Sequence, residues 1–326
     1  MTSVPVAYII FNRPDLTQAT FEALRKQQPS ELFIIADGTR PGHPTDAARC
    51  REARSIVANI DWPCNVRRNY SDSNLGCRRR VLSGLDWVFS EVDRAIILED
   101  DCVPHPDFYT FCQTILDRYE TDERIWVASG SNFQNGNRRG DASYYFSRFN
   151  HCWGWATWRR AWQQNEPQMS FWPQWKQSEE WKAMWPHRRM RSYWEQIFDR
   201  MYREEIDSWA YSWKASAWYH GGLTATPNVN LVSNIGFGSD ATHTQDESPV
   251  SRLHVASIGC IVHPQRVEVN KKADNFTYWF AFKGRHQGFK KQVIRSATKL
   301  KRALIRMKHR ILGSGRTPLA NRPASI

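Results

Sequence analysis

Short apolar runs alternate with segments of helical periodicity through the first hundred residues, and this alternation constrains the fold more than any other feature of the chain. The apolar runs predict strands at residues 4–11, 32–36, 64–68 and 94–98. Strands joined by helices in this way form a mostly parallel sheet with right-handed crossovers. We therefore predict an α/β, Rossmann-like fold in which a mostly parallel sheet is flanked by helices.

The C-terminal tail differs in composition from the rest of the chain. The net charge is +12, and thirteen Lys or Arg but no acidic residue follow Asp274, whereas residues 1–274 hold 32 basic and 33 acidic residues. We predict a globular domain at 1–274 and a basic tail at 275–326. Apolar residues recur every three or four positions from Phe289 to Ile311, which predicts a C-terminal basic amphipathic helix.

A basic amphipathic helix is suited to an anionic membrane surface, which is the partner we expect for the tail. A plain packing helix is the alternative. The tail has no nucleic-acid recognition motif, so no specific nucleic acid is expected as a partner.

The apolar runs and the cysteines also indicate the cellular compartment of the protein. No apolar run approaches the ~20 residues of a membrane span, and the apolar start at Val4 follows no basic segment that would mark a signal peptide. The seven cysteines are odd in number and include no C-x-x-C pair, which fits a reducing compartment. We expect a cytoplasmic protein that lies peripherally at the inner face of the plasma membrane.

Three acidic residues, Glu99, Asp100 and Asp101, follow the apolar run at 94–98. Adjacent carboxylates repel one another by roughly 1 kcal/mol per pair at ~4 Å in water, a cost that a bound divalent cation removes. Strand geometry would place Glu99 and Asp101 on one side and Asp100 on the other. Pro104 is expected to end sheet pairing. The alternative is an ordinary solvated acidic turn.

Two other predicted strands also end in polar residues, Arg13 after the first and Asp37 after the second. The carboxyl ends of parallel strands meet at one edge of a sheet, where ligands collect, so we expect a shared crevice there. The chain has neither a G-x-G-x-x-G nor a G-x-x-x-x-G-K-[ST] motif. Phosphates bound at this edge would therefore be held by a metal ion and basic side chains.

The second half of the chain is rich in tryptophan, with twelve of the sixteen between residues 153 and 218. We expect most of them in the core, because tryptophan is well buried on average. Trp153 and Trp155 flank Gly154 in an expected loop. They are either core residues or a flat wall for the apolar face of a sugar.

Two further segments carry residues suited to chemistry. A stretch rich in Gly, Asn and Ser at 230–244 predicts a loop, which either closes over a substrate or is an ordinary surface loop. It contains two possible metal ligands, Asp240 and His243. A candidate group of catalytic acids precedes Trp209 and consists of Glu204, Glu205 and Asp207.

Seven segments together resemble the GT-A glycosyltransferases, and in particular bacterial polysaccharide-type, family 2-like transferases related to N-acetylglucosaminyltransferase I. They occur in the order of the family and span about three quarters of the chain: PVAYIIFNRPD (5–15), FIIADG (33–38), NLG (74–76), IILEDDCVPHPDFYTF (96–111), HCWGWATW (151–158), DSWAYSW (207–213) and NLVSNIGFGSDATHT (230–244). The resemblance implies a GT-A fold with a nucleotide-sugar-binding half at 1–130 and a Trp-rich acceptor half at 131–274.

The resemblance also implies roles for individual residues. Donor binding would fall to Arg13, Asp37, Arg79 (or its neighbour Arg78), Glu99 and Asp100. Asp101 would hold a Mn²⁺ or Mg²⁺ ion that bridges the diphosphate, with His243 as a further metal residue. Asp207 would be the catalytic base. Because Ala210 rather than an acid follows Trp209, Glu204 and Glu205 stay open as rivals.

The function expected from this reasoning is a metal-dependent, inverting glycosyltransferase. It would move a sugar from a nucleoside-diphosphate sugar, with a UDP-sugar favoured, to a hydroxyl of a glycan or lipid-linked acceptor in surface polysaccharide synthesis. One alternative is a sugar nucleotidyltransferase, although no basic Gly-rich triphosphate loop is present near the first strand. The other is a carbohydrate- or membrane-binding module without catalysis, which leaves the three acids unexplained.

Overall fold

The computed structural model describes residues 3–237, 250 and 253–282. Residues up to Ala281 belong to one compact unit, and the boundary expected at 274 stays a prediction. Asp240, His243 and the predicted C-terminal amphipathic helix lie outside the described residues. None of the helices in the described part has both the length and the apolar content needed to cross a bilayer.

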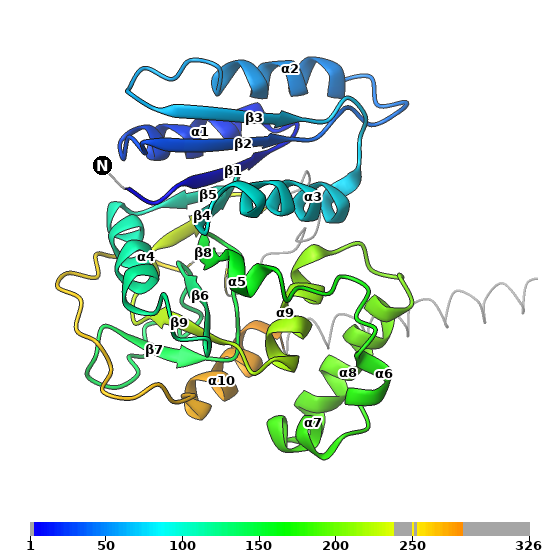
Figure 1. Cartoon of the computed structure of the whole chain (residues 1–326), viewed down its shortest axis with the longest axis vertical. Helices are drawn as coiled ribbons and strands as arrows, with labels where there is room; N and C mark the ends of the chain where they lie inside the picture. Colours follow the sequence, from blue (N-terminus) through cyan, green and yellow to red (C-terminus); the bar gives the residue numbers. More distant parts are fainter. Residues whose placement is uncertain (1–2, 238–249, 251–252, 283–326) are drawn as a thin grey trace, which may run out of the picture. The chain divides into compact units, whose positions relative to one another are not determined.

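An eight-stranded sheet runs through the molecule in the order β3-β2-β1-β4-β8-β6-β9-β7 (Figure 1). The strands β3, β2, β1 and β4 are parallel, as are β6 and β9, whereas β8 and β7 run antiparallel to their neighbours. This arrangement confirms the predicted α/β fold with a mostly parallel sheet. The strand bounds are β1 Val6–Ile10, β2 Glu31–Ala36, β3 Asn65–Tyr70, β4 Arg94–Glu99, β6 Ile125–Ser129, β7 Tyr144–Ser147, β8 Trp155–Trp158 and β9 Leu223–Pro227.

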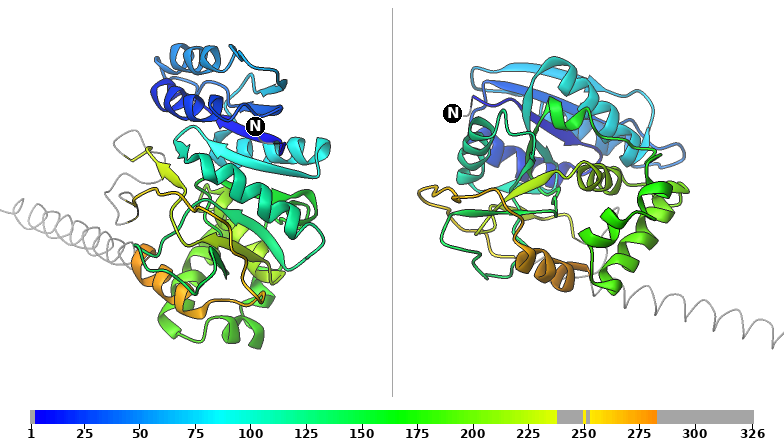
Figure 2. Two further views of the ribbon diagram at one scale, coloured as in Figure 1. Left: turned by 90° about the vertical axis from the view of Figure 1, so that its left-hand side faces the viewer. Right: turned by 60° about the horizontal axis from the view of Figure 1, so that its bottom comes forward.

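Helices cover both faces of the sheet (Figure 2). Residues of α1, α2 and α4 pack on the face of β1 that carries Val6, Tyr8 and Ile10, and residues of α3, α5 and α9 pack on the face that carries Ala7 and Ile9. Both faces are apolar because the parallel strands are buried on two sides. The helices are α1 Pro14–Arg25, α2 Asp46–Ile56, α3 Gly76–Glu91, α4 Pro106–Arg118, α5 Arg159–Trp162, α6 Trp172–Trp175, α7 Glu179–Met184, α8 Arg188–Tyr202, α9 Trp209–Tyr219 and α10 Lys271–Thr277.

The expectation that Pro104 ends sheet pairing is wrong. Residues Cys102–Pro104 form β5, which pairs antiparallel with β10 (Val232–Asn234), and Pro104 lies opposite Val232. This ribbon has only two strands, so each strand is an edge, where the missing N–H of proline is tolerated.

The tryptophans of residues 153–218 are buried, as expected, with the exception of the half-buried Trp153. The loop expected around Gly154 is shorter than predicted, because Trp155 begins β8 and stacks on Trp209 at a centroid distance of 5.7 Å. β8 is buried on both faces, so its sequence lacks the apolar–polar alternation of a half-exposed strand. Trp155 is therefore a core residue, and only Trp153 remains available as a wall for a ligand.

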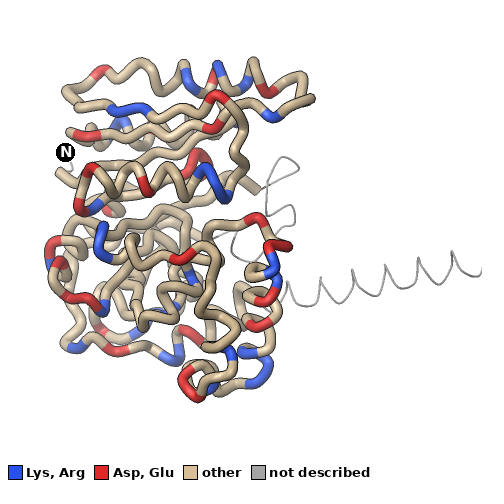
Figure 3. Tube along the Cα trace, turned by 45° about the vertical axis from the view of Figure 1, so that its right-hand side comes forward, with Lys and Arg blue, Asp and Glu red and all other residues tan. Residues whose placement is uncertain are grey.

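Basic and acidic residues are interspersed along the described chain (Figure 3), in line with the near-neutral balance of residues 1–274. The excess of positive charge is therefore a property of the tail sequence.

Candidate active site at the carboxyl edge of the sheet

The polar residues that follow β1, β2 and β4 share one edge of the sheet. These three strands are neighbours and run parallel, so their carboxyl ends lie side by side. Arg13 follows β1, Asp37 follows β2, and the acidic residues end β4. The shared edge expected from the sequence is confirmed.

Arg13 binds two of the three acids. Its Nη2 donates to Oδ1 of Asp100, its Nε lies 3.4 Å from Oδ2 of Asp100, and its Nη1 lies 3.0 Å from Oδ2 of Asp101. The two aspartates therefore face the same guanidinium, and the predicted alternation of their side chains is wrong. The strand ends at Glu99, and the chain turns at Asp100 and Asp101, so the period of two no longer applies.

Glu99 is the third acid of the cluster. Burial and then the neighbouring Asp101 raise the pKa of Glu99 to about 8, although Arg13 lowers it. Within the described residues, Arg13 is the one cation paired with acids of this cluster. Glu99 therefore favours its protonated form at neutral pH, and a further cation bound beside it would favour the ionised form.

The end of β10 and the two residues that follow it contact Asp101. Asn234 Nδ2 lies 3.3 Å from Oδ1 of Asp101, and the backbone N–H of Ile235 donates to the carbonyl oxygen of Asp101 at 2.8 Å. A Cβ atom added at Gly236 would lie 2.3 Å from Oδ2 of Asp101, so only glycine allows this approach. The chain thus holds the Asp101 carboxylate between Arg13 and the strand β10.

The described residues contain no group of three His, Cys, Asp or Glu side chains arranged to hold a metal ion. Binding of a Mn²⁺ or Mg²⁺ ion stays a prediction; such a site would need few protein ligands, because Mg²⁺ is commonly bound through one or two carboxylates together with substrate phosphates. Asp101 supplies such a carboxylate, with its side chain partly exposed. The role of His243 stays a prediction, because this residue lies outside the described part.

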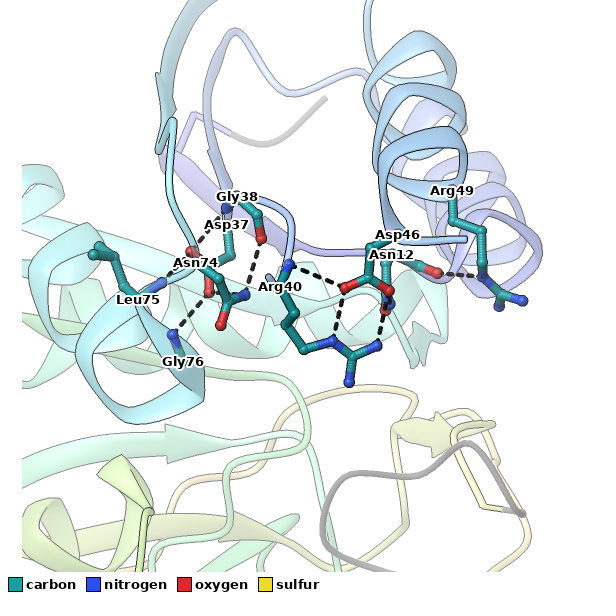
Figure 4. A network of polar contacts seen from close by, with 9 residues as sticks. All are labelled: Asn12, Asp37, Gly38, Arg40, Asp46, Arg49, Asn74, Leu75 and Gly76. Atoms are coloured by element: carbon teal, nitrogen blue, oxygen red, sulfur yellow. Dashed lines mark hydrogen bonds and ion pairs between the residues drawn. The ribbon is translucent and has the colours of Figure 1, made fainter. Parts of the chain in front are cut away.

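Asp37 is bound entirely by the chain itself (Figure 4). Its Oδ1 accepts the backbone N–H groups of Gly38 and Leu75 at 2.8 and 2.9 Å, and its Oδ2 accepts Asn74 Nδ2 and the N–H of Gly76 at 3.0 and 3.1 Å. Two bonds at each oxygen fill the acceptor sites of a carboxylate. Asp37 therefore fixes the N-terminus of α3 beside the acids, and its direct contact with a nucleotide stays a prediction.

Replacing Asp37 with alanine should destabilise the fold by about 3 kcal/mol, because several backbone and amide donors would lose their buried acceptor. The free energy of unfolding in urea measures this effect. Asp72→Ala, at an exposed position in the loop that also holds Asn74 and Leu75, is the matched control and should change stability little. Equal effects of the two substitutions would contradict the structural role of Asp37.

Asp46 organises a second network at this edge, which the sequence did not reveal (Figure 4). Its buried carboxylate accepts Nε and Nη2 of Arg40 at 2.7 and 2.8 Å and Nδ2 of Asn12 at 2.8 Å. Arg49 Nε donates to the carbonyl oxygen of Asn12 at 2.7 Å. The residues just before Arg13 are thereby held from α2. In the sequence, Asp46 is indistinguishable from any acid in a first helical turn.

The Arg40 hydrogen bonds hold the pKa of Asp46 well below its ordinary value. Because the folded-state pKa is lower than the unfolded value of about 3.9, the stabilisation is present above that pH and is lost as the pH falls through the acidic range. Asp46→Asn should cost about 2 kcal/mol at neutral pH. Its stability deficit should shrink in urea titrations carried out towards pH ~3, whereas the exposed Glu52→Gln should show no such convergence.

The two arginines at the start of α3 differ in their surroundings. Arg78 donates through Nη2 to the carbonyl oxygen of Pro167 at 2.7 Å, whereas Arg79 is exposed on the first turn. Arg79 is thus the freer of the two for a ligand, and its role in donor binding stays a prediction.

Asp207 lies beside the start of α3. A Cβ atom added at Gly76 would lie 3.6 Å from Oδ2 of Asp207. Burial raises the pKa of the thiol of the next residue, Cys77, and the charges of Glu99 and Asp207 raise it further. Glu205 is instead paired with Arg203 and Arg200 on the surface, at 2.6 and 3.5 Å.

An aromatic group stands beside Asp101. Trp153 contacts Phe237 at a centroid distance of 5.5 Å and Phe133 at 5.1 Å. Phe237 directly follows Gly236, which touches the Asp101 carboxylate. An aromatic group therefore adjoins Asp101, and the role of Trp153 as a wall for a sugar stays a prediction.

The fold and the site define a class: an α/β protein with a charged site at the carboxyl edge of its parallel strands. Residues 68–189 match the model of the GNT-I family. The match covers less than half of the 326 residues and includes the acids, but not Arg13, Asp37 or Asp207. It confirms the resemblance to the GT-A glycosyltransferases and supports a transferase that uses nucleotide sugars.

Solved structures show only distant similarity. The inositol-1-phosphate CTP transferase from T. maritima is 10% identical with a TM-score of 0.37, over 72% of this chain and 91% of that one. Mouse xyloside xylosyltransferase 1 is 11% identical with a TM-score of 0.31, over 68% and 83%. A UDP-glucose pyrophosphorylase complexed with UDP-glucose is 8% identical with a TM-score of 0.27, over 50% and 81%. Similarity at this level supports no statement about activity.

Proposed function

We propose that this protein is an inverting glycosyltransferase that moves a sugar from a nucleoside-diphosphate sugar to an acceptor hydroxyl. The observation that carries the proposal is the acid cluster after β4, which is paired to Arg13 at the carboxyl edge of the parallel strands. The proposed reaction uses two components. One is a group of acids that would bind a metal ion, and the other is a separate exposed carboxylate that would act as the base.

Asp207 is the proposed base. Its carboxylate is exposed to solvent and can accept the proton of the acceptor hydroxyl. Arg13 holds Asp100 and Asp101 in fixed positions, so the carboxylate of Asp101 is oriented before a ligand arrives. A Mn²⁺ or Mg²⁺ ion bound at Asp101 would neutralise charge on the departing diphosphate.

Trp153 and Phe237 are proposed to contact the apolar face of a sugar. The acceptor, from the resemblance alone, is proposed to be a glycan or a lipid-linked glycan of surface polysaccharide synthesis. The basic tail is proposed to attach the enzyme to an anionic membrane, a proposal that rests on its sequence. Sedimentation with vesicles of anionic or neutral lipid, with and without residues 283–326, tests that attachment.

The proposed function is tested by a thermal-shift screen of nucleoside diphosphates with and without Mn²⁺. A diphosphate at about 100 times its Kd should add roughly 2.7 kcal/mol of stability, and only with the metal present. The preferred nucleotide then identifies the sugar nucleotides to assay. Release of nucleoside diphosphate with an inverted anomeric product would support the proposal. Release of pyrophosphate from a nucleoside triphosphate, or glycan binding without turnover, would overturn it.

A further inference from the structure

Lys214 is a buried cation in the second half of the chain. It lies on α9 with 6% of its surface exposed, and its Nζ donates to the carbonyl oxygen and to Oδ1 of Asn150, both at 2.8 Å. The same ammonium group lies 5.6 to 5.8 Å from the ring centroids of Phe149, Trp194 and Trp218. Two carbonyl groups and three aromatic faces therefore surround the charge.

No carboxylate of the described residues forms an ion pair with Lys214. Its charged and titratable neighbours are Cys152 and His151 on the adjoining segment and Asp274 on α10, which itself binds Ser147 and Arg148. Removing an ammonium from water costs several kcal/mol, and methionine of similar volume would avoid that cost. We therefore expect the ammonium group of Lys214 to fix the positions of its neighbours rather than to stabilise the fold.

The Lys214–Asn150 contact joins two parts of the candidate active site. α9 begins at Trp209, two residues after Asp207, so the helix that bears Lys214 also sets the position of the proposed base. Asn150 lies three residues before Trp153, which stands beside the Phe237 ring next to Asp101. A second bond between the same parts runs from Trp218 Nε1 on α9 to the carbonyl oxygen of Arg148 at 2.6 Å.

We propose that Lys214 is a positioning residue for sugar transfer, which fixes the segment bearing Trp153 against the helix that follows Asp207. Through Asn150 it sets the separation between the base and the wall of the sugar site. This inference rests on the proposed function. A misplacement of about 1 Å between reacting groups can cost about 10²-fold in rate, so a remote contact of this kind is able to control turnover.

Asn150 supplies a matched pair of variants. Its Nδ2 is buried without a hydrogen-bond partner, so Asn150→Asp removes an unpaired donor and gives Lys214 a carboxylate at the same place. Asn150→Leu keeps the branched shape of the side chain and removes its oxygen acceptor, while the backbone carbonyl oxygen stays. We expect Asn150→Asp to keep kcat near the wild-type value, and Asn150→Leu and Lys214→Met to lower it about 10²-fold. Donor Kd, measured with the nucleoside diphosphate and Mn²⁺, should change less than about twofold in all three.

Hydrogen exchange gives a readout that does not depend on activity. The amides of residues 150–153 should exchange at least about tenfold faster in Lys214→Met than in the wild type, and at the wild-type rate in Asn150→Asp. Lys176→Met, which removes a lysine from a surface ion pair with Asp199, is the control and should change neither readout.

Unchanged exchange of these amides in Lys214→Met would overturn the positioning role, whether or not the protein transfers sugar. A kcat that is equally low in Asn150→Asp and Asn150→Leu would also overturn the positioning role. Failure of the wild-type protein to transfer sugar from any nucleotide sugar would instead overturn the proposed function. Circular dichroism of each variant separates loss of fold from loss of position.

Discussion

Asp101→Asn should lower sugar transfer about 10³-fold and remove the Mn²⁺-dependent stabilisation by nucleoside diphosphates. The substitution keeps the size of the side chain but removes the charge that a divalent cation requires. Its single amide oxygen can accept from either Arg13 Nη1 or Asn234 Nδ2, which bind different oxygens of Asp101. Initial rates at saturating acceptor and thermal shifts with and without Mn²⁺ measure the two effects.

Asp117→Asn is the matched control for Asp101→Asn. Asp117 lies on α4, where its carboxylate forms a half-exposed ion pair with Arg94 at 2.6 Å. Surface pairs of this kind contribute about 0–1 kcal/mol, so both activity and donor binding should stay near the wild-type level. Full transfer activity in Asp101→Asn would refute the metal-binding role of Asp101.

Asp207→Asn should lower kcat by about 10²–10⁴-fold and leave the Mn²⁺-dependent thermal shift by nucleoside diphosphate unchanged. The amide cannot accept the proton of the acceptor hydroxyl. Within the described residues, no hydrogen bond or ion pair joins Asp207 to Arg13, Asp100 or Asp101, which are the residues proposed for donor and metal binding. The two substitutions therefore separate chemistry from donor binding. Asp101→Asn should lower both sugar transfer and Mn²⁺-dependent donor binding, whereas Asp207→Asn should lower sugar transfer alone.

Glu205→Gln tests whether the base has been assigned to the right acid. Glu205 is paired with Arg203 and Arg200 on the surface, whereas Asp207 lies near Gly76 and Cys77. Transfer by Glu205→Gln should therefore stay within about twofold of the wild type. A large loss in Glu205→Gln together with normal kcat in Asp207→Asn would move the base to Glu205.

The parallel half of the sheet was predictable because its signals are local. Each strand of β1, β2 and β4 is a continuous apolar run that ends in a polar residue, and helices of regular period join the runs. From these signals alone, Arg13, Asp37 and the acids were expected at one edge. The antiparallel strand β8 was missed because it is buried on both faces and occupies a gap between β4 and β6 that no local pattern indicates.

The individual contacts at the site were less predictable than its place. The sequence indicated a charged edge, but not that one guanidinium would bind both Asp100 and Asp101, because the turn after Glu99 ends the strand alternation. Nor did it indicate that Asp37 accepts hydrogen bonds from Leu75 and Gly76 at the start of α3, or that Asp46 holds Asn12 before Arg13.

The α/β alternation, the grouping of polar strand ends and the resemblance to the GT-A glycosyltransferases could be predicted, because each depends on residues adjacent in the chain. The folded chain was needed to show that Asp207 lies beside Gly76, that Trp153 contacts Phe237, and that Lys214 bonds to Asn150 across 64 residues. Such pairs are set by how strands and helices pack around a common core, and no spacing in the sequence encodes the distance between them.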